Sequence, residues 1–134
     1  MPDSQTMDWE RVLAWAGAYE RAWRAPGVDA LAGVFSPDAS YRQAPYLEPV
    51  VGLAAISRMW EAERVGPDEE FQLTSSPVAL EGDTAVVRVE VRYGGSVPQE
   101  YRDLWVIRFA PDGTCRAFEE WPFWPGKDYR ATPG

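Results

Sequence analysis

The chain has 134 residues and a mass of 15.1 kDa, a size that suits one domain and leaves no room for two. Its net charge of −8 disfavours binding to nucleic acid and to anionic membrane surfaces. With no histidine and a single cysteine, the sequence excludes Ser-His-Asp and Cys-His catalysis, histidine-ligated zinc and an internal disulfide. No segment approaches the roughly 20 apolar residues that span a bilayer, and the acidic start MPDSQTMDWE lacks a signal-peptide pattern, so we expect a cytoplasmic protein of the bacterial type.

Apolar residues at helical spacing predict a first helix over residues 7–24, which Thr6 can cap. One broad face of this helix is expected to hold Trp9, Val12, Leu13, Ala16, Tyr19, Glu20 and Trp23. A second, short helix is expected over residues 28–35. A third is expected over residues 53–65, where a Gly-Pro pair follows as a stop signal.

Strands are expected in the rest of the chain. A Ser-Pro-Asp break at residues 36–38 precedes a strand over residues 39–44. Alternating apolar and polar residues, punctuated by glycine-containing turns, predict four further strands, over residues 71–81 (bent at Pro77), 84–93, 99–109 and 114–123. Helices early and an antiparallel meander late give an α+β fold, with three helices covering one face of a curved, mostly antiparallel sheet. The expected single domain spans residues 1–134 with a core of about 7–124; residues 1–6 and 125–134 are expected to be loose.

Asp103 is the first candidate for a functional acid. It shares its strand face with Tyr101 and with the apolar Trp105, Ile107 and Phe109, so it should point toward the helices. An ionised, unpaired carboxylate there costs several kcal/mol, so the group needs a partner or a raised pKa, and acid/base sites use both. The alternative is an aspartate at the strand end, in water or paired with an arginine.

Glu120 and Tyr19 are the other catalytic candidates. Alternation with Phe118 places Glu120 inward and Glu119 outward, unless a bulge reverses them. Neighbouring carboxyls push one pKa upward, which can leave one acid and one base. Tyr19 can donate a hydrogen bond to a carbonyl or a developing oxyanion. The alternatives are a solvated acidic pair and a tyrosine that only fills the core.

Seven Trp, six Tyr and five Phe give the chain many large rings. Seven of them are candidates to line a cavity: Tyr41, Tyr46, Trp60, Tyr101, Trp105, Phe118 and Trp121. An aromatic-walled cavity suits a flat, mostly apolar small molecule, although a small domain also needs large side chains to fill its core. Four arginines are expected on the outer sheet face, either solvated or at a dimer interface: Arg42, Arg92, Arg102 and Arg108.

Three strings in this order, GVFSPDASYRQAP, VVGLAAISRMW and FAPDGTCRAFEEW, resemble the nuclear transport factor 2-like superfamily, in particular its SnoaL-like branch. The resemblance implies a cone-shaped, cystatin-like roll that encloses a pocket, often an enzyme site and often a homodimer. The superfamily also includes members without catalysis, so the fold does not settle the function.

Three groups of superfamily enzymes offer residue patterns. Against the steroid isomerases, Tyr19 matches the oxyanion-hole tyrosine, but the general base falls near Gln43 and the oxyanion-hole acid falls on Trp105, and neither residue can replace an acid. We therefore do not expect that mechanism. In the SnoaL-like polyketide cyclases, a pocket acid lies near the start of the penultimate strand, where Asp103 stands.

The string Arg88-Val89-Glu90 resembles the Arg-x-acid string of limonene-type epoxide hydrolases, and Glu120 lies near their final carboxylate. However, the two charged residues alternate with valines. If the valines face the core, the charges face solvent or a partner subunit.

The leading interpretation is a SnoaL-like small-molecule pocket protein that can act as a cofactor-independent acid/base enzyme (isomerase, cyclase, lyase or hydrolase) on a mostly apolar or aromatic metabolite. Asp103 and Glu120 would do the acid/base work, and Tyr19 or Tyr41 would orient the substrate. Substrate contacts are expected from Tyr41, Gln43, Tyr46, Trp60, Tyr101, Trp105 and Phe118, with no metal or cofactor. The sequence leaves two alternatives open: a non-catalytic ligand-binding or accessory homodimer, and a structural dimer with a filled core.

Overall fold

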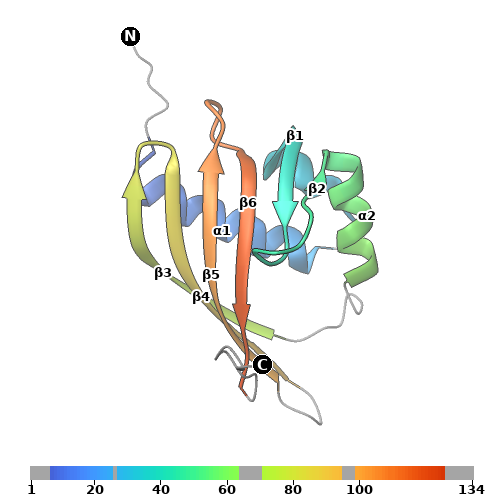
Figure 1. Ribbon diagram of the computed structural model, residues 1–134, viewed down its shortest axis with the longest axis vertical. Coiled ribbons are helices and arrows are strands. Elements are labelled where there is room, and N and C mark those ends of the chain that lie inside the picture. Colours follow the sequence, from blue (N-terminus) through green and yellow to red (C-terminus); the bar gives the residue numbers. More distant parts are fainter. Residues whose placement is uncertain (1–6, 26, 64–70, 95–98, 126–134) are drawn as a thin grey trace, which may run out of the picture.

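A six-stranded mixed sheet is the framework of the computed structural model, which describes residues 7–25, 27–63, 71–94 and 99–125 (Figure 1). The elements in chain order are helix α1 (Trp9–Arg24), the 3-10 helix η1 (Asp29–Gly33), strands β1 (Phe35–Arg42) and β2 (Val50–Val51), helix α2 (Leu53–Glu63), and strands β3 (Phe71–Glu81), β4 (Thr84–Tyr93), β5 (Gln99–Phe109) and β6 (Cys115–Phe123). No helix in these ranges is long and apolar enough to cross a membrane.

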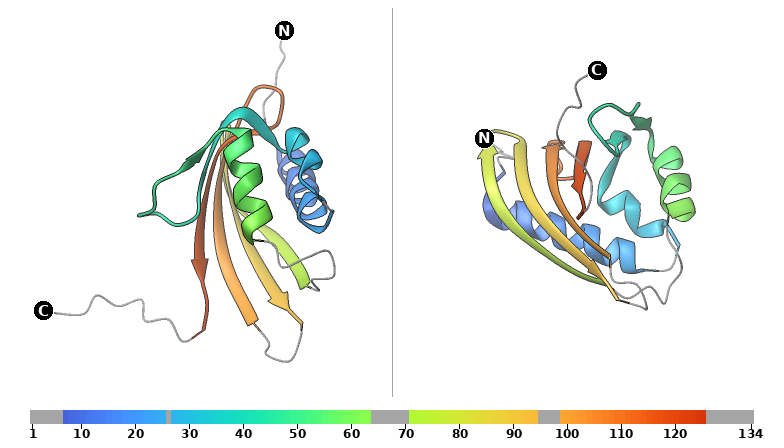
Figure 2. Two further views of the ribbon diagram at one scale, coloured as in Figure 1. Left: turned by 90° about the vertical axis from the view of Figure 1, so that its right-hand side faces the viewer. Right: turned by 60° about the horizontal axis from the view of Figure 1, so that its bottom comes forward.

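The strand order is β2-β1-β6-β5-β4-β3. Strands β3 to β6 form an antiparallel meander, β1 runs parallel to β6, and the two-residue β2 pairs antiparallel with β1. The sheet is strongly curved and is not closed. Helix α1 crosses its concave face, and α2 lies beside β1 and β2 (Figure 2). The expected α+β fold, with helices on one face of a curved and mostly antiparallel sheet, is confirmed.

The bounds of three strands, β3, β4 and β5, agree with the sequence prediction, and β6 begins one residue later than predicted. The predicted bend at Pro77 is a register shift between Pro77 and Ala79. These strands could be located because their alternation is regular and tight turns separate them. Gly82 and Gly113 occupy the two turns with positive φ, a conformation that glycine adopts without a steric penalty.

Other local predictions were wrong. Strand β1 begins at Phe35 and runs through the Ser-Pro-Asp segment that was expected to break the chain, with an irregular register between Phe35 and Ser40. Such an irregularity lets a strand accommodate a proline, which has no N–H to donate. The second helix is only a short 3-10 turn, and β2 was not predicted. Asp8, rather than Thr6, is the N-cap of α1, and its carboxylate accepts a hydrogen bond from the Arg11 N–H at 2.9 Å.

Two predicted features lie outside the described residues: the end of the third helix beyond residue 63, and the terminal segments of residues 1–6 and 126–134.

The core is centred on Trp15, which the sequence interpretation omitted. Its ring contacts five other aromatic rings, Tyr19, Phe35, Trp105, Phe109 and Phe118. Its indole N–H donates to the Val34 carbonyl at 2.9 Å, which satisfies the one polar atom of the side chain. The buried stripe of α1 consists of Val12, Trp15, Ala16, Tyr19 and Ala22. The predicted face contained Val12, Ala16 and Tyr19 correctly but lacked Trp15 and Ala22, and it included Leu13, which is 39% exposed.

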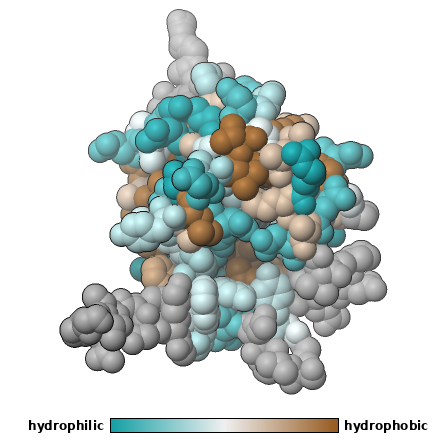
Figure 3. Space-filling view, turned by 45° about the vertical axis from the view of Figure 1, so that its right-hand side comes forward, coloured by the Kyte–Doolittle hydropathy of each residue, from teal (hydrophilic) through white to brown (hydrophobic). Residues whose placement is uncertain are grey.

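Exposed apolar side chains gather in two places. One group lies on the β1–β2 connection and β2 (Tyr46, Leu47 and Val51), and the other at the end of β6 (Trp121, Phe123 and Trp124). Figure 3 shows one side of the molecule, on which apolar residues form separate patches among polar ones. Small separate patches are normal on a protein surface, whereas the second group is considered below as part of an interface.

We expect Trp15→Ala to lower the free energy of unfolding by about 3–5 kcal/mol, because it removes the central ring of the core and leaves a cavity. Leu13→Ala, two residues earlier on the same helix, is the matched control and should change stability by less than about 1 kcal/mol. Urea unfolding followed by far-UV circular dichroism measures both. Equal effects of the two substitutions would contradict the assignment of the buried stripe.

Candidate functional site

Asp103 lies on the inner, helix-covered face of β5 and is 5% exposed. It shares this face with Trp105, Ile107 and Phe109, all buried, as the alternation predicted. Its neighbours across the sheet are Val89 on β4 and Pro122 on β6. The sheet thus carries a carboxyl group into an otherwise apolar layer.

Glu120 lies on the same face of the neighbouring strand. It pairs across the sheet with Trp105 and is diagonal to Asp103, within hydrogen-bonding reach of its carboxyl group. Glu119 lies on the opposite face, where it forms an ion pair with Arg42 at 3.7 Å. The prediction that Glu120 faces inward and Glu119 outward is therefore correct. Asp103 and Glu120 are called the dyad below.

Burial raises the pKa of Asp103. Hydrogen bonding from the Glu120 carboxyl, the Phe123 backbone N–H and the Trp105 indole acts in the opposite direction and favours the Asp103 anion. No well-aligned hydrogen bond joins the indole to Asp103, however: Oδ1 of Asp103 and Nε1 of Trp105 are buried and have no hydrogen-bond partner among the described residues. A buried polar atom without a partner is rare in proteins and needs an explanation.

The pKa of Glu120 is raised well above its usual range. Burial is the largest cause, followed by the hydrogen bond to Asp103, the negative charge of Asp103 and the more distant charge of Glu63. The dyad therefore shares a proton, which resides on Glu120, while Asp103 is the group that its neighbours stabilise as an anion.

Two buried tyrosines lie next to the dyad. The hydroxyls of Tyr19 on α1 and Tyr41 on β1 are hydrogen-bonded at 2.7 Å. Burial raises the pKa of both, and the negative charge of Glu120 acts in the same direction on each. At neutral pH both hydroxyls keep their protons. Only one of the two protons lies in the bond between them, so the other can be donated elsewhere.

Rings surround this polar group. The Tyr19 ring lies 4.5 Å from Trp105, 5.0 Å from Trp60 and 5.6 Å from Phe118, measured between centroids. The Tyr41 ring lies 4.6 Å from Phe118. Trp60, Trp105 and Phe118, all buried, are called the aromatic wall below. The wall limits the access of water to the dyad, in which Asp103 is buried and Glu120 is half-buried, and so strengthens the electrostatic interactions within it.

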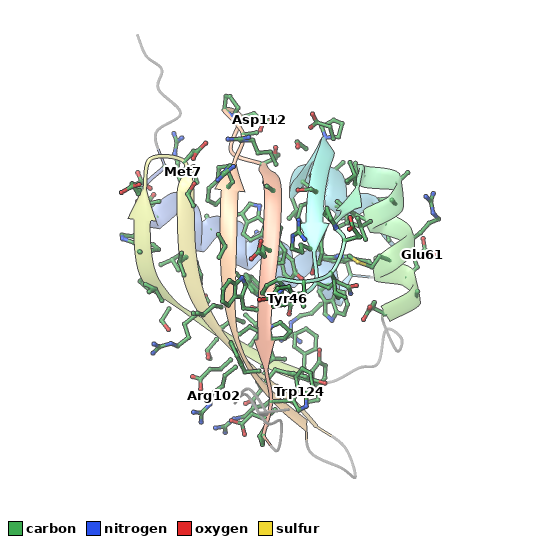
Figure 4. The ribbon with its side chains drawn as sticks, in the orientation of Figure 1. Met7, Tyr46, Glu61, Arg102, Asp112 and Trp124 are labelled. Carbon is green, nitrogen blue, oxygen red and sulfur yellow. The ribbon has the colours of Figure 1, made fainter. Side chains whose placement is uncertain are left out.

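The remaining predicted contact residues lie outside this group. The Gln43 amide donates to Oε1 of Glu63 at 2.7 Å. Tyr101 is half-buried and packs against Tyr93 and Trp124. Tyr46 is fully exposed on the β1–β2 connection, which projects away from α1 (Figures 2 and 4). The structure does not bring Tyr46 to the dyad. The prediction failed because residues in this irregular connection show no periodic pattern from which the direction of a side chain can be inferred.

Glu63 was not considered in the sequence interpretation. It is exposed at the end of α2, and its charge is the smallest of the causes that raise the pKa of Glu120. The Arg-x-acid string of β4 lies outside the site. Arg88 is exposed, and Glu90 pairs with Arg102 at 3.4 Å on the outer face.

Two further observations concern reactive groups. Cys115 is buried, and burial raises the pKa of its thiol to about 12, which makes it a poor nucleophile at neutral pH. Within the described part of the chain, no three His, Cys, Asp or Glu side chains are arranged to hold a metal ion.

A family model for the SnoaL-like domain matches residues 16–118. The chain belongs to this family. The match includes Tyr19, Tyr41, Trp60, Asp103, Trp105 and Phe118 and ends two residues before Glu120. The sequence matches no curated protein.

Solved structures with the same fold include other SnoaL-like and nuclear transport factor 2-like proteins. A candidate ketosteroid isomerase from Kribbella flavida DSM 17836 is 24% identical, with 93% of this chain and 84% of that chain covered and a TM-score of 0.62. A candidate polyketide cyclase from Sinorhizobium meliloti is 23% identical, with 80% and 93% covered and a TM-score of 0.59. An epoxide hydrolase resembling the limonene type, from Mycobacterium tuberculosis, is 10% identical, with 85% and 84% covered and a TM-score of 0.66. At these identities the likeness shows the fold.

We expect stability to fall as the pH rises through the raised pKa values of the dyad. The folded-state pKa values exceed those of the unfolded chain, so the stabilisation is complete at low pH and is lost as the carboxyls ionise. Glu120→Gln should flatten this decline, whereas Glu119→Gln should preserve it.

Urea unfolding between pH 4 and pH 9, followed by tryptophan fluorescence, compares the three proteins. Hydrogen bonds lower the pKa values of Asp83 and Asp112, so these groups titrate with the opposite sign, but they are present in every variant and cancel in the comparison. Parallel curves for the wild type and Glu120→Gln would show that the dyad is not held protonated in the folded state.

Proposed function

We propose that this SnoaL-like domain binds a mostly apolar or aromatic small molecule and acts on it by cofactor-independent acid/base chemistry at the dyad. The observation that carries the proposal is a buried aspartate with an unpartnered oxygen, next to a second carboxyl and a tyrosine pair, inside an aromatic layer. Structural ion pairs do not explain this arrangement, because no basic side chain is paired with the dyad among the described residues.

The roles follow from the environments. Asp103 is the general base, because hydrogen bonds favour its anion and its Oδ1 is available to accept a proton. Glu120 is the general acid, because it holds its proton to a higher pH. The tyrosine pair supplies one hydroxyl proton toward an oxygen on which negative charge develops. Removing a proton from carbon or water and delivering one to oxygen are steps common to isomerases, cyclases, lyases and hydrolases.

The residues favour this site over two others known in the superfamily. The position of the steroid isomerase base is Gln43, an amide bonded to Glu63, and the position of their acid is Trp105. In this chain a carboxyl group stands two residues before Trp105 on the same strand face, so an acid lines the site from a different position. The arginine and acid that resemble the epoxide hydrolase string lie on the outer face.

A carbon-acid assay tests the base directly. With 2-tetralone in D₂O, proton NMR measures exchange of the α-protons above the buffer rate. We expect the protein to accelerate exchange, Asp103→Asn to reduce the acceleration by about 10²–10⁴-fold, and Glu119→Gln to leave it unchanged. Native circular dichroism checks that each variant is folded.

The outcomes separate the two candidate functions. Exchange lost in Asp103→Asn supports the acid/base enzyme. Binding of 2-tetralone, seen by saturation transfer, without exchange would overturn the catalytic part and favour a non-catalytic ligand-binding or accessory protein. Absence of binding by this and related aromatic ketones would contradict both.

We further propose that the domain, spanning residues 1–134, functions in the cytoplasm as a homodimer joined through the outer sheet face. On that face Leu104 pairs with Trp121 across β5 and β6, and Arg102 pairs with Phe123. Trp121 is exposed, while Arg102 lies in ion pairs with Glu90 and Glu100. An apolar strip bordered by charges has the composition of a protein interface and would make association sensitive to salt.

Light scattering after size exclusion tests the dimer. We expect a mass of about twice the 15.1 kDa of one chain, and a shift toward one chain in Trp121→Glu. Val78→Glu introduces the same charge at an exposed apolar residue of the edge strand β3 and should leave the mass unchanged. A monomer at every concentration, in low and high salt, would refute the dimer.

A further inference from the structure

The dyad lies in a group of acids that no described cation neutralises. Glu63 raises the pKa of Glu120 from the end of α2, and no basic side chain counteracts it. Every described arginine except Arg42 is exposed, and Arg42 is engaged with Glu119 and with the Leu47 carbonyl, away from the dyad. Natural proteins almost always pair buried carboxylates with a cation or a proton, and the residues that the structure describes supply no cation for the one negative charge that the shared proton leaves.

Asp103 supplies the second, independent observation. Its side chain is 95% removed from water, and Oδ1 has no hydrogen-bond partner among the described residues. Leaving a carboxylate oxygen buried and unpaired is costly, so the residue is suited to a ligand that brings a donor. A positively charged donor satisfies that oxygen better than a neutral one, because charge-assisted hydrogen bonds are roughly twice as strong.

The aromatic wall points to the same chemistry. The Tyr19 ring lies 4.5 Å from the Trp105 ring and 5.0 Å from the Trp60 ring, and Trp105 pairs across the sheet with Glu120. The faces of such rings attract cations, and they also pack well against an apolar body. Carboxylates next to electron-rich rings form a site for an organic cation, whereas a site for an anionic or phosphorylated molecule would need the arginines that here remain outside.

We propose that the ligand of this site carries a protonated amine on an aromatic or apolar body, with the ammonium against Asp103 and Glu120 and the body against the aromatic wall. This inference rests on the proposed small-molecule function and narrows its substrate class. The ammonium pairs with the Asp103 anion while Glu120 keeps its proton, so the charges in the bound site cancel and Glu120 remains available as the general acid. No proton leaves the site and no covalent bond changes.

The pH dependence follows from the groups that face the dyad. These are Glu63 on α2, Tyr19 on α1 and Tyr41 on β1, all of them acids, together with the dyad itself on β5 and β6. Raising the pH ionises Asp103 and strengthens amine binding, until the amine itself loses its charge near pH 10. A neutral ligand of the same shape gains no affinity from this rise in pH.

Phenethylamine and 2-phenylethanol make a matched pair, because they differ only in the ammonium and the hydroxyl. Isothermal titration at pH 6 and pH 8 measures both. We expect phenethylamine to bind at least 10-fold more tightly at pH 8, with a smaller advantage at pH 6. In buffers of different ionisation enthalpy the measured heat should be the same, because Glu120 keeps its proton when the amine binds.

Three variants test which carboxyl groups cause the preference for the amine over the alcohol. Asp103→Asn and Glu120→Gln should each remove most of the amine preference, and Glu119→Gln, the neighbouring carboxyl on the other face, should retain it. The wild-type comparison of the two ligands decides the question even if Asp103→Asn fails to fold. Equal or tighter binding of 2-phenylethanol would overturn the amine inference and leave the small-molecule function intact. Binding of neither compound would overturn the amine inference, and if aromatic ketones also fail to bind, the proposed function falls with it.

Discussion

A carboxyl group buried on the apolar inner face of the sheet is the constraint on which the organisation of this molecule depends. Asp103 cannot remain an isolated anion in that position, so it must share a proton or meet a donor. The register between β5 and β6 places Glu120 diagonally across from Asp103. Helix α1, which covers this face of the sheet, contributes the Tyr19 hydroxyl. Each neighbour changes the charge that the others can carry, so the polar group behaves as one titrating unit.

Much of this arrangement could be predicted from the sequence, because the side chains of a strand alternate between the two faces of the sheet. In a strand that alternates regularly, the direction of one buried ring fixes the direction of every second residue, and so Asp103 and Glu120 were correctly placed inward. Tight turns at Gly82 and Gly113 fixed the strand ends. The start of strand β1 was predicted wrongly because residues 36–38 do not favour a strand by themselves. They form one because β1 pairs with β6, which is distant in the sequence.

The predictions of the buried face of α1 and of the position of Tyr46 failed for different reasons. On α1, several apolar side chains support two overlapping stripes, and only the packing against the sheet selects the one containing Trp15. Tyr46 stands in a connection without periodicity, where residue type alone says nothing about direction. Glu63 joined the site only because α2 packs beside β1, a contact that pattern reading does not supply.

Strand β3 forms the outer border of the sheet, and its opposite border is the two-residue β2. Long exposed borders invite other chains to add strands, but β3 carries Pro77 and a register irregularity beside it, which interrupt the row of free N–H groups. Lateral growth of the sheet is thereby discouraged at both borders. These two borders therefore disfavour the strand-by-strand addition of further chains that builds fibrous aggregates, even though the chain carries an unusually large number of rings.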